Sequence, residues 1–243
     1  AAAYVGLGMA YHGQNKVELA EQMFLRAEEL ESGYWFVHNE LGIFYGREER
    51  FDESVSRFRR VIELTPESNI GYDNLAATLL NGGELEWAKE VFEQVPDPTR
   101  WTFENRALVY YYLGEFDNAV ADMKRAVELA PDHHKTWGDL ADAYRHAVRA
   151  EEAREAYEEA IGLARESLGV NPGDESTIAR LATYLAYTGQ AEAAEAVHGA
   201  RQQEGELQPD DCQDGDQRVA HPVPQQRLAP AQALGARGAH EIL

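Results

Sequence analysis

The sequence predicts an all-α solenoid built from antiparallel pairs of helices. A motif of large and small residues returns about every 34 residues, and spacings of three and four place its large side chains on one helix face. Short polar or glycine-bearing turns, such as Asn81-Gly82-Gly83, separate the two halves of each copy. Because neither helix of a pair can bury its apolar face alone, we expect successive copies to stack on one another.

The first two copies give the pattern for the rest. The first copy contains Tyr4, Leu7, Gly8, Tyr11, Ala20, Phe24 and Ala27. The second copy contains His38, Leu41, Gly42, Tyr45, Ser54, Phe58 and Val61. Small residues such as Gly8 and Ala20 are expected where the two helices of a pair approach most closely. Asp52 and Asp117 are expected to cap the second helices of their copies.

The later copies keep the pattern but differ in length. The third contains Tyr72, Leu75, Ala76, Leu79, Ala88, Phe92 and Val95. Pro96 and Pro98 follow at once and are expected to shorten its second helix, so that the next copy arrives about three residues early. The fourth contains Phe103, Ala107, Tyr110, Ala119, Met123 and Ala126. The fifth contains Trp137, Leu140, Ala141, Tyr144, Ala153, Tyr157 and Ala160, and the weaker sixth contains Ile178, Leu181, Ala182, Leu185 and Ala194.

These copies resemble the tetratricopeptide repeat superfamily over roughly residues 1–204, in units starting near residues 1, 35, 69, 100, 134 and 175. The resemblance implies a right-handed superhelix whose concave groove is lined by the first helix of each pair. In the fifth unit the second helix is expected to run on to Asn171-Pro172, about two turns further than in a plain repeat. That stretch is similar to the C-terminal arrays of bacterial multidomain signalling proteins, which follow a kinase, a nucleotide cyclase or a winged-helix domain.

The repeat pattern stops before residues 205–243. This segment contains Pro222, Pro224 and Pro230 among Gln, Ala, Arg and Gly, a composition typical of an irregular or disordered tail. The alternative is a shift of the reading frame near Cys212. With either origin the last helix pair lacks a cap, so we expect exposed apolar surface around Leu181 and Leu185.

The composition excludes several classes of partner and site. The chain has 43 acidic and 22 basic residues and a formal net charge of −21, which repels nucleic acids and anionic membranes. Its one cysteine excludes an internal disulfide and a multi-cysteine zinc site. No apolar run approaches the about 20 residues of a membrane helix, and the first residues lack the basic region of a signal peptide. We expect a cytoplasmic protein.

The sequence predicts no enzyme, cofactor or metal site. Gly6-Leu7-Gly8 imitates part of a nucleotide-binding loop, but it lies inside a helical pattern with no strand before it. His133 and His134 are adjacent in a turn between repeats and lack the spacing of helical metal ligands, so we expect both to be solvated. No serine or cysteine is placed beside a base.

If the chain follows the superfamily, residues of the first helices that face away from their partner helix line the groove. The main candidates are Phe36, Asn39, Asn74, Trp101, Asn105, Tyr111, Tyr112, Lys135 and Arg145. Further expected lining residues are Glu40, Arg47, Ile70, Asp73, Glu104, Leu108, Asp139, Asp142, His146, Arg180 and Tyr187.

Two residue types in this set suggest how a ligand is held. Asn74 and Asn105 occupy equivalent places in successive repeats, where their amides can bond the backbone of an extended peptide. The alternative is that they are tolerated polar residues on an exposed face. Trp101, Tyr111 and Tyr112 are candidate anchors for a ligand side chain, and the alternative for them is packing within the solenoid.

The resulting hypothesis is a non-catalytic protein-interaction scaffold that binds a peptide or helix of another protein. Because Glu40, Asp73 and Glu104 are expected near the middle of the groove, the ligand is expected to be neutral to basic, or apolar. The alternative is a regulatory repeat array of a bacterial signalling protein whose kinase, cyclase or winged-helix domain is absent from this sequence.

Overall fold

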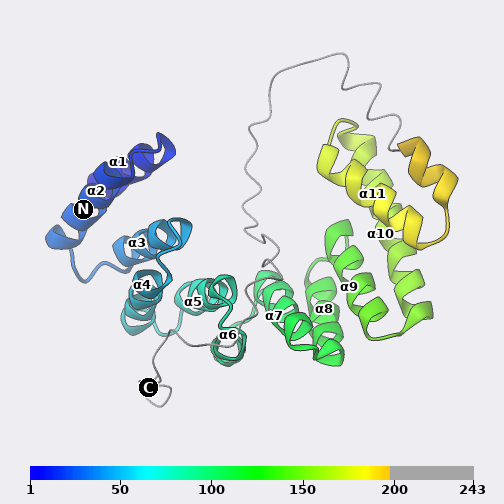
Figure 1. The fold of residues 1–243 in the computed structure, drawn as a ribbon, viewed down its shortest axis with the longest axis horizontal. Helices are drawn as coiled ribbons and strands as arrows, with labels where there is room; N and C mark the ends of the chain where they lie inside the picture. The colour runs from blue at the N-terminus through cyan, green and yellow to red at the C-terminus, as the bar shows by residue number, and fades with distance from the viewer. Residues whose placement is uncertain (198–243) are drawn as a thin grey trace.

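The computed structural model of the protein describes residues 1–197, and all regular structure in that range is helical. The helices are α1 (Ala2–Gly13), α2 (Val17–Leu30), α3 (Trp35–Arg47), α4 (Phe51–Leu64), α5 (Asn69–Gly82), α6 (Leu85–Glu93), α7 (Arg100–Leu113), α8 (Phe116–Leu129), α9 (His134–His146), α10 (Ala150–Val170) and α11 (Glu175–Tyr187). A further helix covers residues 191–197. Figure 1 shows the helices following one another along an arc, with α1 and α2 at one end and α10 and α11 at the other.

Each helix packs on the one before it and the one after it in the chain. In the first two pairs, an aromatic ring of the second helix lies directly on a glycine of the first. A Cβ added to Gly8 would lie 2.9 Å from the ring of Phe24, and one added to Gly42 would lie 2.6 Å from the ring of Phe58. These glycines are therefore needed for the close approach of the two helices, as their place in the repeat predicts.

The buried residues form three clusters along the arc instead of one central core. The first contains Phe24 and Leu41, and the second contains Phe58 and Leu75. The third is the largest and extends from Ala107 of α7 to residues of α11. This arrangement follows from stacking, because each repeat contacts only its neighbours.

Two second helices depart from the common length, as the sequence predicts. Helices α2, α4 and α8 have 14 residues each, whereas α6 has 9 and α10 has 21. Helix α6 ends at Glu93, just before Pro96, which has no backbone N–H to continue a helix. Helix α10 continues to Val170, which is 89% exposed, while Ala164 and Leu168 in its last two turns still pack against the third cluster. The expected short and long helices are both confirmed.

Two sequence-based expectations are wrong, one about the caps of the second helices and one about the exposure of the last repeat. Asp52 and Asp117 lie in the first turns of α4 and α8, and the N-cap positions belong to Arg50 and Glu115, without a side-chain cap. The carboxylates therefore face the positive end of the helix dipole instead of bonding a backbone N–H. Leu181 and Leu185 are 3% and 1% exposed, because α11 packs them against α10 and α9. The expected tail, residues 205–243, lies outside the described residues.

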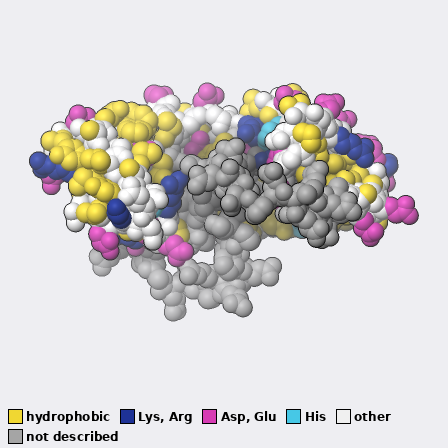
Figure 2. All heavy atoms as spheres, turned by 90° about the horizontal axis from the view of Figure 1, so that it is seen from above, with side chains coloured by type: hydrophobic (Ala, Val, Ile, Leu, Met, Phe, Trp, Pro, Cys, Tyr) yellow, Lys and Arg dark blue, Asp and Glu magenta, His cyan; other side chains and the backbone are white. Residues whose placement is uncertain are grey.

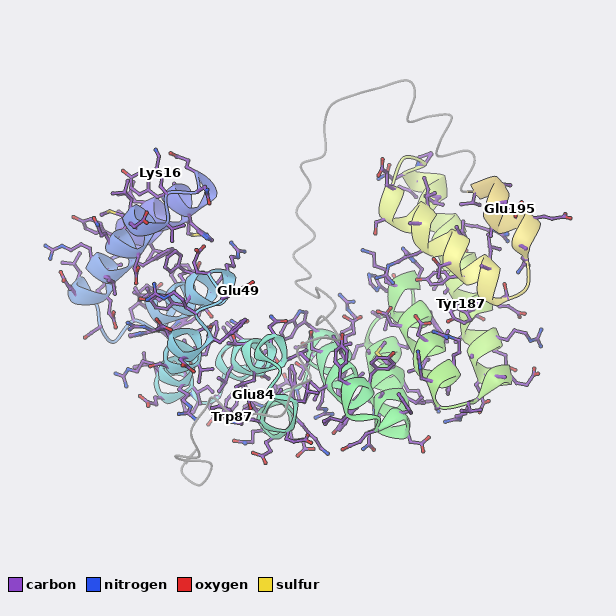
Figure 3. All side chains as sticks on the ribbon, in the orientation of Figure 1. Lys16, Glu49, Glu84, Trp87, Tyr187 and Glu195 are labelled. Atoms are coloured by element: carbon purple, nitrogen blue, oxygen red, sulfur yellow. The ribbon has the colours of Figure 1, made fainter. Side chains whose placement is uncertain are left out.

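The turn inside each pair has a residue in the left-handed backbone conformation. These residues are Asn15, Glu49, Gly83, Gly114, Val148 and Gly189, with φ between 57° and 85°. Figure 3 marks three of the turns with Lys16, Glu49 and Glu84. Glycine adopts this conformation without strain, whereas a β-branched residue does so at a cost. Val148 is therefore strained, and its side chain is 89% exposed, so packing does not compensate for the strain.

Replacing Val148 with glycine is expected to stabilise the protein by about 1–2 kcal/mol, because it removes left-handed strain at no cost in packing. Urea unfolding followed by circular dichroism measures the change. The reverse substitution in the neighbouring repeat, Gly114→Val, is expected to destabilise the protein by a similar amount. Equal stability of Val148→Gly and the wild type would contradict this account of the turn.

A second prediction concerns Gly138 of α9, where an added Cβ would collide with the ring and hydroxyl of the buried Tyr184. Gly138→Ala is expected to destabilise the protein by about 1–3 kcal/mol through overpacking. Gly162 of α10 is the matched control, since an added Cβ there meets nothing within 4 Å. Gly162→Ala should instead stabilise the helix by about 0.5–1 kcal/mol. Thermal unfolding of both variants measures the change in stability. The midpoint temperature should fall for Gly138→Ala and rise for Gly162→Ala.

Candidate ligand-binding groove

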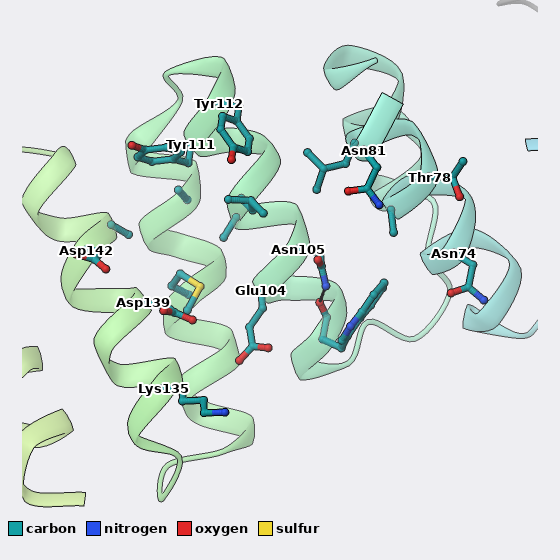
Figure 4. A pocket seen from close by; sticks show the side chains of 18 of the residues that line it. Asn74, Thr78, Asn81, Glu104, Asn105, Tyr111, Tyr112, Lys135, Asp139 and Asp142 are labelled. Atoms are coloured by element: carbon teal, nitrogen blue, oxygen red, sulfur yellow. Dashed lines mark hydrogen bonds between the residues drawn. The ribbon is translucent and has the colours of Figure 1, made fainter. Parts of the chain in front are cut away.

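A groove of about 860 Å³ lies along the concave side of the arc. Its walls come from the first helices α3, α5, α7 and α9, with Ser176 and Arg180 contributed by α11. Second helices also reach it, because Phe58 of α4 and Met123 of α8 line it as well. Figure 4 shows α5 and α7 facing each other across this space, with α9 beside α7.

The structure places most of the predicted site residues around this groove. Those that line it are Asn74, Trp101, Asn105, Tyr111, Tyr112, Lys135 and Arg145, together with Arg47, Glu104, Leu108, Asp139, Asp142, His146 and Arg180 from the wider prediction. Phe36 and Asn39 do not line it, since Phe36 packs against the first cluster and Asn39 is buried at 7% exposure. Glu40, Ile70, Asp73 and Tyr187 also lie outside the lining.

Sequence reasoning missed several lining residues on the first helices, among them Ile43, Ala77, Thr78 and Asn81. The repeat register contained the signal for three of them. Asn81 occupies the same place in its repeat as Tyr112, and Ile43 and Ala77 occupy the same place as Leu108. Including the residues equivalent to Tyr112 and Leu108 in every repeat would have found these three.

The two asparagines are each bonded within the protein by one amide hydrogen. Asn74 Nδ2 donates to Asn39 Oδ1 at 2.8 Å, and Asn105 Nδ2 donates to the Trp101 carbonyl at 2.8 Å. Within residues 1–197 their side-chain carbonyl oxygens accept no hydrogen bond. Each amide can therefore still accept one hydrogen bond, and donate a second, toward a peptide backbone in the groove.

The aromatic candidates form two apolar areas on α7. Trp101 is partly buried, with its ring centroid 6.4 Å from that of Phe92, so it packs within the solenoid and lines the groove at the same time. Tyr111 and Tyr112 are each 37% exposed, with ring centroids 5.5 Å apart. The ring of His146 lies edge-on to Tyr111 at 4.7 Å. Figure 4 shows the two tyrosines at one rim of the groove and Lys135 toward the opposite rim.

The carboxylates of the groove are bonded to groups of the protein itself. Glu104 accepts hydrogen bonds from Arg100 at 2.7 Å and from Thr136 at 2.8 Å. Asp139 accepts one from Arg180 at 3.2 Å, and Asp142 accepts one from the hydroxyl of Tyr157 at 2.6 Å. The charged lining residues of the described chain are Arg47, Lys135, Arg145, Arg180, Glu104, Asp139 and Asp142. Their charges nearly balance, in contrast to the strongly acidic chain as a whole.

Asp73, expected in the groove, is instead buried between α5 and α7 at 8% exposure. The Thr102 hydroxyl donates to its Oδ2 at 3.2 Å, and its Oδ1 has no hydrogen-bond partner within the described residues. Burial raises the pKa of Asp73 from 3.8 to about 6, because the charged form loses its hydration. Asp73 is still mainly ionised at pH 7, but its side chain lies between the two helices and not in the lining of the groove.

His134 is also placed differently from the expectation. It is buried at 7% exposure, with Nε2 3.2 Å from Thr177 Oγ1 of α11, because the next repeat covers the start of α9. Burial, the main cause, lowers its pKa to about 4, so it is neutral at pH 7. His133 contacts Thr136 through Nδ1 at 2.8 Å. No group of three potential metal ligands occurs within residues 1–197.

Comparisons with known proteins assign the family. Models of the tetratricopeptide repeat match residues 1–34 and residues 98–166. The chain is a tetratricopeptide repeat protein. A human protein named tetratricopeptide repeat protein 6 is 22% identical over 164 residues, which are 65% of this chain and 32% of that protein. The chain thus spans about a third of that relative's length.

Solved structures show the same tetratricopeptide repeat fold. PilW, described as a type IV pilus biogenesis factor, matches with a TM-score of 0.64 at 16% identity, covering 85% of this chain and 94% of its own. YrrB, described as a tetratricopeptide repeat protein with an unusual peptide-binding site, matches with a TM-score of 0.50 at 15% identity, covering 76% and 98%. The fold is the all-α solenoid that the repeat pattern predicts, and the resemblance to this family implies its right-handed superhelix. Within residues 1–197 no helix has the length and apolar character needed to cross a bilayer.

The raised pKa of Asp73 predicts a pH-dependent stability. Between pH 4 and pH 6, Asp73 keeps its proton in the folded protein but has lost it in the unfolded chain. The stability of the fold therefore falls as the pH rises through this range, because the folded protein must then bury an ionised carboxylate. Asp73→Asn is expected to stabilise the protein by up to about 3 kcal/mol at pH 7.5, with the gain vanishing near pH 4. Urea unfolding at both values measures this, with Asp132→Asn on an exposed turn as control. A gain that is the same at both pH values would contradict it.

Proposed function

We propose that this chain binds an extended, predominantly apolar segment of another protein in its groove and catalyses no reaction. The single observation that carries the proposal is the continuity of the groove across α3, α5, α7 and α9. A pocket for a small molecule needs only a few converging groups, whereas this lining repeats similar places over successive helices. A chain molecule that presents one side chain after another fits such a surface.

The middle of the groove offers the two contacts that an extended peptide needs. Asn74 and Asn105 lie on facing helices, each with a free carbonyl oxygen among the described residues, and can bond the ligand backbone. Trp101 and the pair Tyr111 and Tyr112 lie on the same helix, about 15 Å apart along its axis by helix rise. They can receive two apolar side chains of the ligand, one on each side of the bonded backbone.

The charges of the groove support a neutral, apolar ligand over a strongly basic one. Glu104, Asp139 and Asp142 already accept bonds from groups of the protein, and Asp73 lies outside the lining. A cationic ligand would find these carboxylates already partly neutralised and would face Lys135 and Arg145 nearby. Binding is therefore expected to depend weakly on salt concentration.

The comparisons support the same class of function. Peptide binding is part of the description of YrrB, which shares this fold. Because the identity is 15%, that likeness concerns the fold, and the groove residues named above make the proposal specific to this chain.

A second candidate function rests on the length of α10. Its 21 residues and the sequence of the fifth repeat are similar to repeat arrays in bacterial signalling proteins. Under this alternative the groove receives a segment of a kinase, cyclase or winged-helix domain encoded in the same gene. Sequencing the gene upstream of Ala1 tests it, since an in-frame domain of one of these classes would support it and its absence would count against it.

The groove proposal predicts that Trp101→Ala weakens ligand binding at least tenfold, because the variant removes a central aromatic anchor. Peptides selected from a random 12-residue library on the wild-type chain provide the ligand, and fluorescence anisotropy measures the dissociation constants. The triple variant Trp101→Ala, Asn74→Ala, Asn105→Ala is expected to abolish binding.

Trp87 of α6 is the matched control. It lies outside the groove (Figure 3), and the guanidinium of Arg59 lies 4.9 Å from the centre of its ring, so Trp87→Ala should leave affinity unchanged. Circular dichroism verifies that each variant keeps its helices. Selected peptides that bind the triple variant as well as the wild type would reject the groove as the binding site.

A further inference from the structure

The floor of the groove is lower where it crosses α5 than on the helices beside it. The same position of the repeat lines the groove in α3, α5, α7 and α9, where its residues are Ile43, Ala77, Leu108 and Asp142. The side chain of Ala77 is a methyl group, whereas Ile43 and Leu108 carry branched chains. Because α5 packs on both α3 and α7, Ala77 lies at the bottom of a recess between two bulkier residues. We call this site the Ala77 recess.

Two amides flank the recess along α5. Asn74 precedes Ala77 by three residues and Asn81 follows it by four, so all three lie on the groove face of the helix. Figure 4 shows both asparagines on α5. The side-chain carbonyl of Asn74 accepts no hydrogen bond within residues 1–197, and Asn81 is exposed. A peptide backbone that crosses α5 can therefore bond an amide on each side of the recess.

The part of the groove formed by α5 carries no charge. Its lining residues are Asn74, Ala77, Thr78, Leu80 and Asn81. In Figure 2, which looks onto the concave side of the arc, the visible acidic side chains lie mostly along the outline of the molecule. The recess therefore suits an uncharged side chain better than a lysine or an arginine.

The protein itself shows which side chain packs on a small residue of a helix. The rings of Phe24 and Phe58 lie on Gly8 and Gly42, so closely that an added Cβ would be 2.9 Å and 2.6 Å from them. A flat ring fills the space above a small residue and makes close-packed contact with it. Ala77 has a small side chain of this kind, but it belongs to the open lining of the groove.

The spacing of the first helices fixes the register of a bound segment. Packed helices lie about 8–10 Å apart, and an extended chain advances about 3.3 Å per residue. Ligand residues that lie over Ile43, Ala77 and Leu108 are therefore three positions apart. The branched chains of Ile43 and Leu108 leave room for small ligand side chains, whereas the recess leaves room for a large one.

We propose that the Ala77 recess receives an aromatic side chain of the bound segment, with small side chains three positions before and after it. This inference rests on the function proposed above and specifies the ligand by the pattern small-x-x-aromatic-x-x-small. The residues beside the small one over Leu108 then contact Trp101 and Tyr112 on the same helix. Residues 198–243 contain no Phe, Trp or Tyr, so that segment of the chain does not supply the ring.

Peptides selected from a random 12-residue library on the full wild-type chain test the pattern. We expect a shared aromatic residue, with Gly, Ala or Ser at the third position on each side. Replacing this aromatic residue with alanine should weaken binding at least tenfold in fluorescence anisotropy. Selected peptides without a shared aromatic position would overturn the proposal.

Ala77→Leu fills the recess and is expected to weaken binding of a selected peptide at least tenfold. The alanine-substituted peptide should bind Ala77→Leu and the wild type equally, because it has no ring to place. Since α7 has Leu108 at the same position, Ala77→Leu should keep the helicity and thermal midpoint of the wild type in circular dichroism. Ala121→Leu, at an exposed alanine of α8 outside the lining, is the matched control and should bind as the wild type does.

The recess and the groove fail this test in different ways. Equal affinity of the wild type and Ala77→Leu for a peptide that the triple variant of Trp101, Asn74 and Asn105 does not bind would overturn the recess and leave the groove. Peptides that the triple variant binds as well as the wild type would reject the groove, and the recess with it.

Discussion

The contact between an aromatic ring of a second helix and a small residue of its partner is the constraint on which this fold depends. The ring of Phe24 lies on Gly8 and also 5.3 Å from the ring of Phe44 in the next repeat. Packing within a pair and packing between pairs therefore use the same side chain. Removal of such a buried ring typically costs 3–5 kcal/mol, so one truncation would loosen two junctions.

The sequence predicts most of the fold because the repeat register places every helix. It does not predict the first residue of each second helix. There the left-handed turn residue, such as Glu49, determines where the chain can enter the helix, and Arg50 takes the N-cap position without a capping side chain. Local turn geometry thus overrides the preference of Asp52 for a cap. The short α6 was predictable because proline removes a donor, whatever the surroundings.

The register also predicts which positions of a repeat face the groove, but it does not predict the hydrogen-bond partners or the burial of the side chains at these positions. Asn105 turns one amide hydrogen to the Trp101 carbonyl, and Asp142 accepts from Tyr157. Burial of His134 depends on Thr177, 43 residues away. Burial of Asp73 depends on the junction between α5 and α7. The burial of His134 and of Asp73 comes from contacts between repeats, which the spacing within one repeat does not contain. The hydrogen bonds of Asn105 and Asp142 lie within one repeat and depend on side-chain orientation, which the spacing does not give either.

Helix α7 belongs to two of the three buried clusters, because Val109 lies in the second while Ala107 and Tyr110 lie in the third. It therefore packs on both the second and the third cluster and connects the two halves of the arc. The opposite surface of the same helix forms the centre of the groove. A ligand that contacts the groove on both sides of α7 would therefore restrict the motion of one half of the solenoid relative to the other. Ligand binding would then reduce flexibility in repeats that do not contact the ligand.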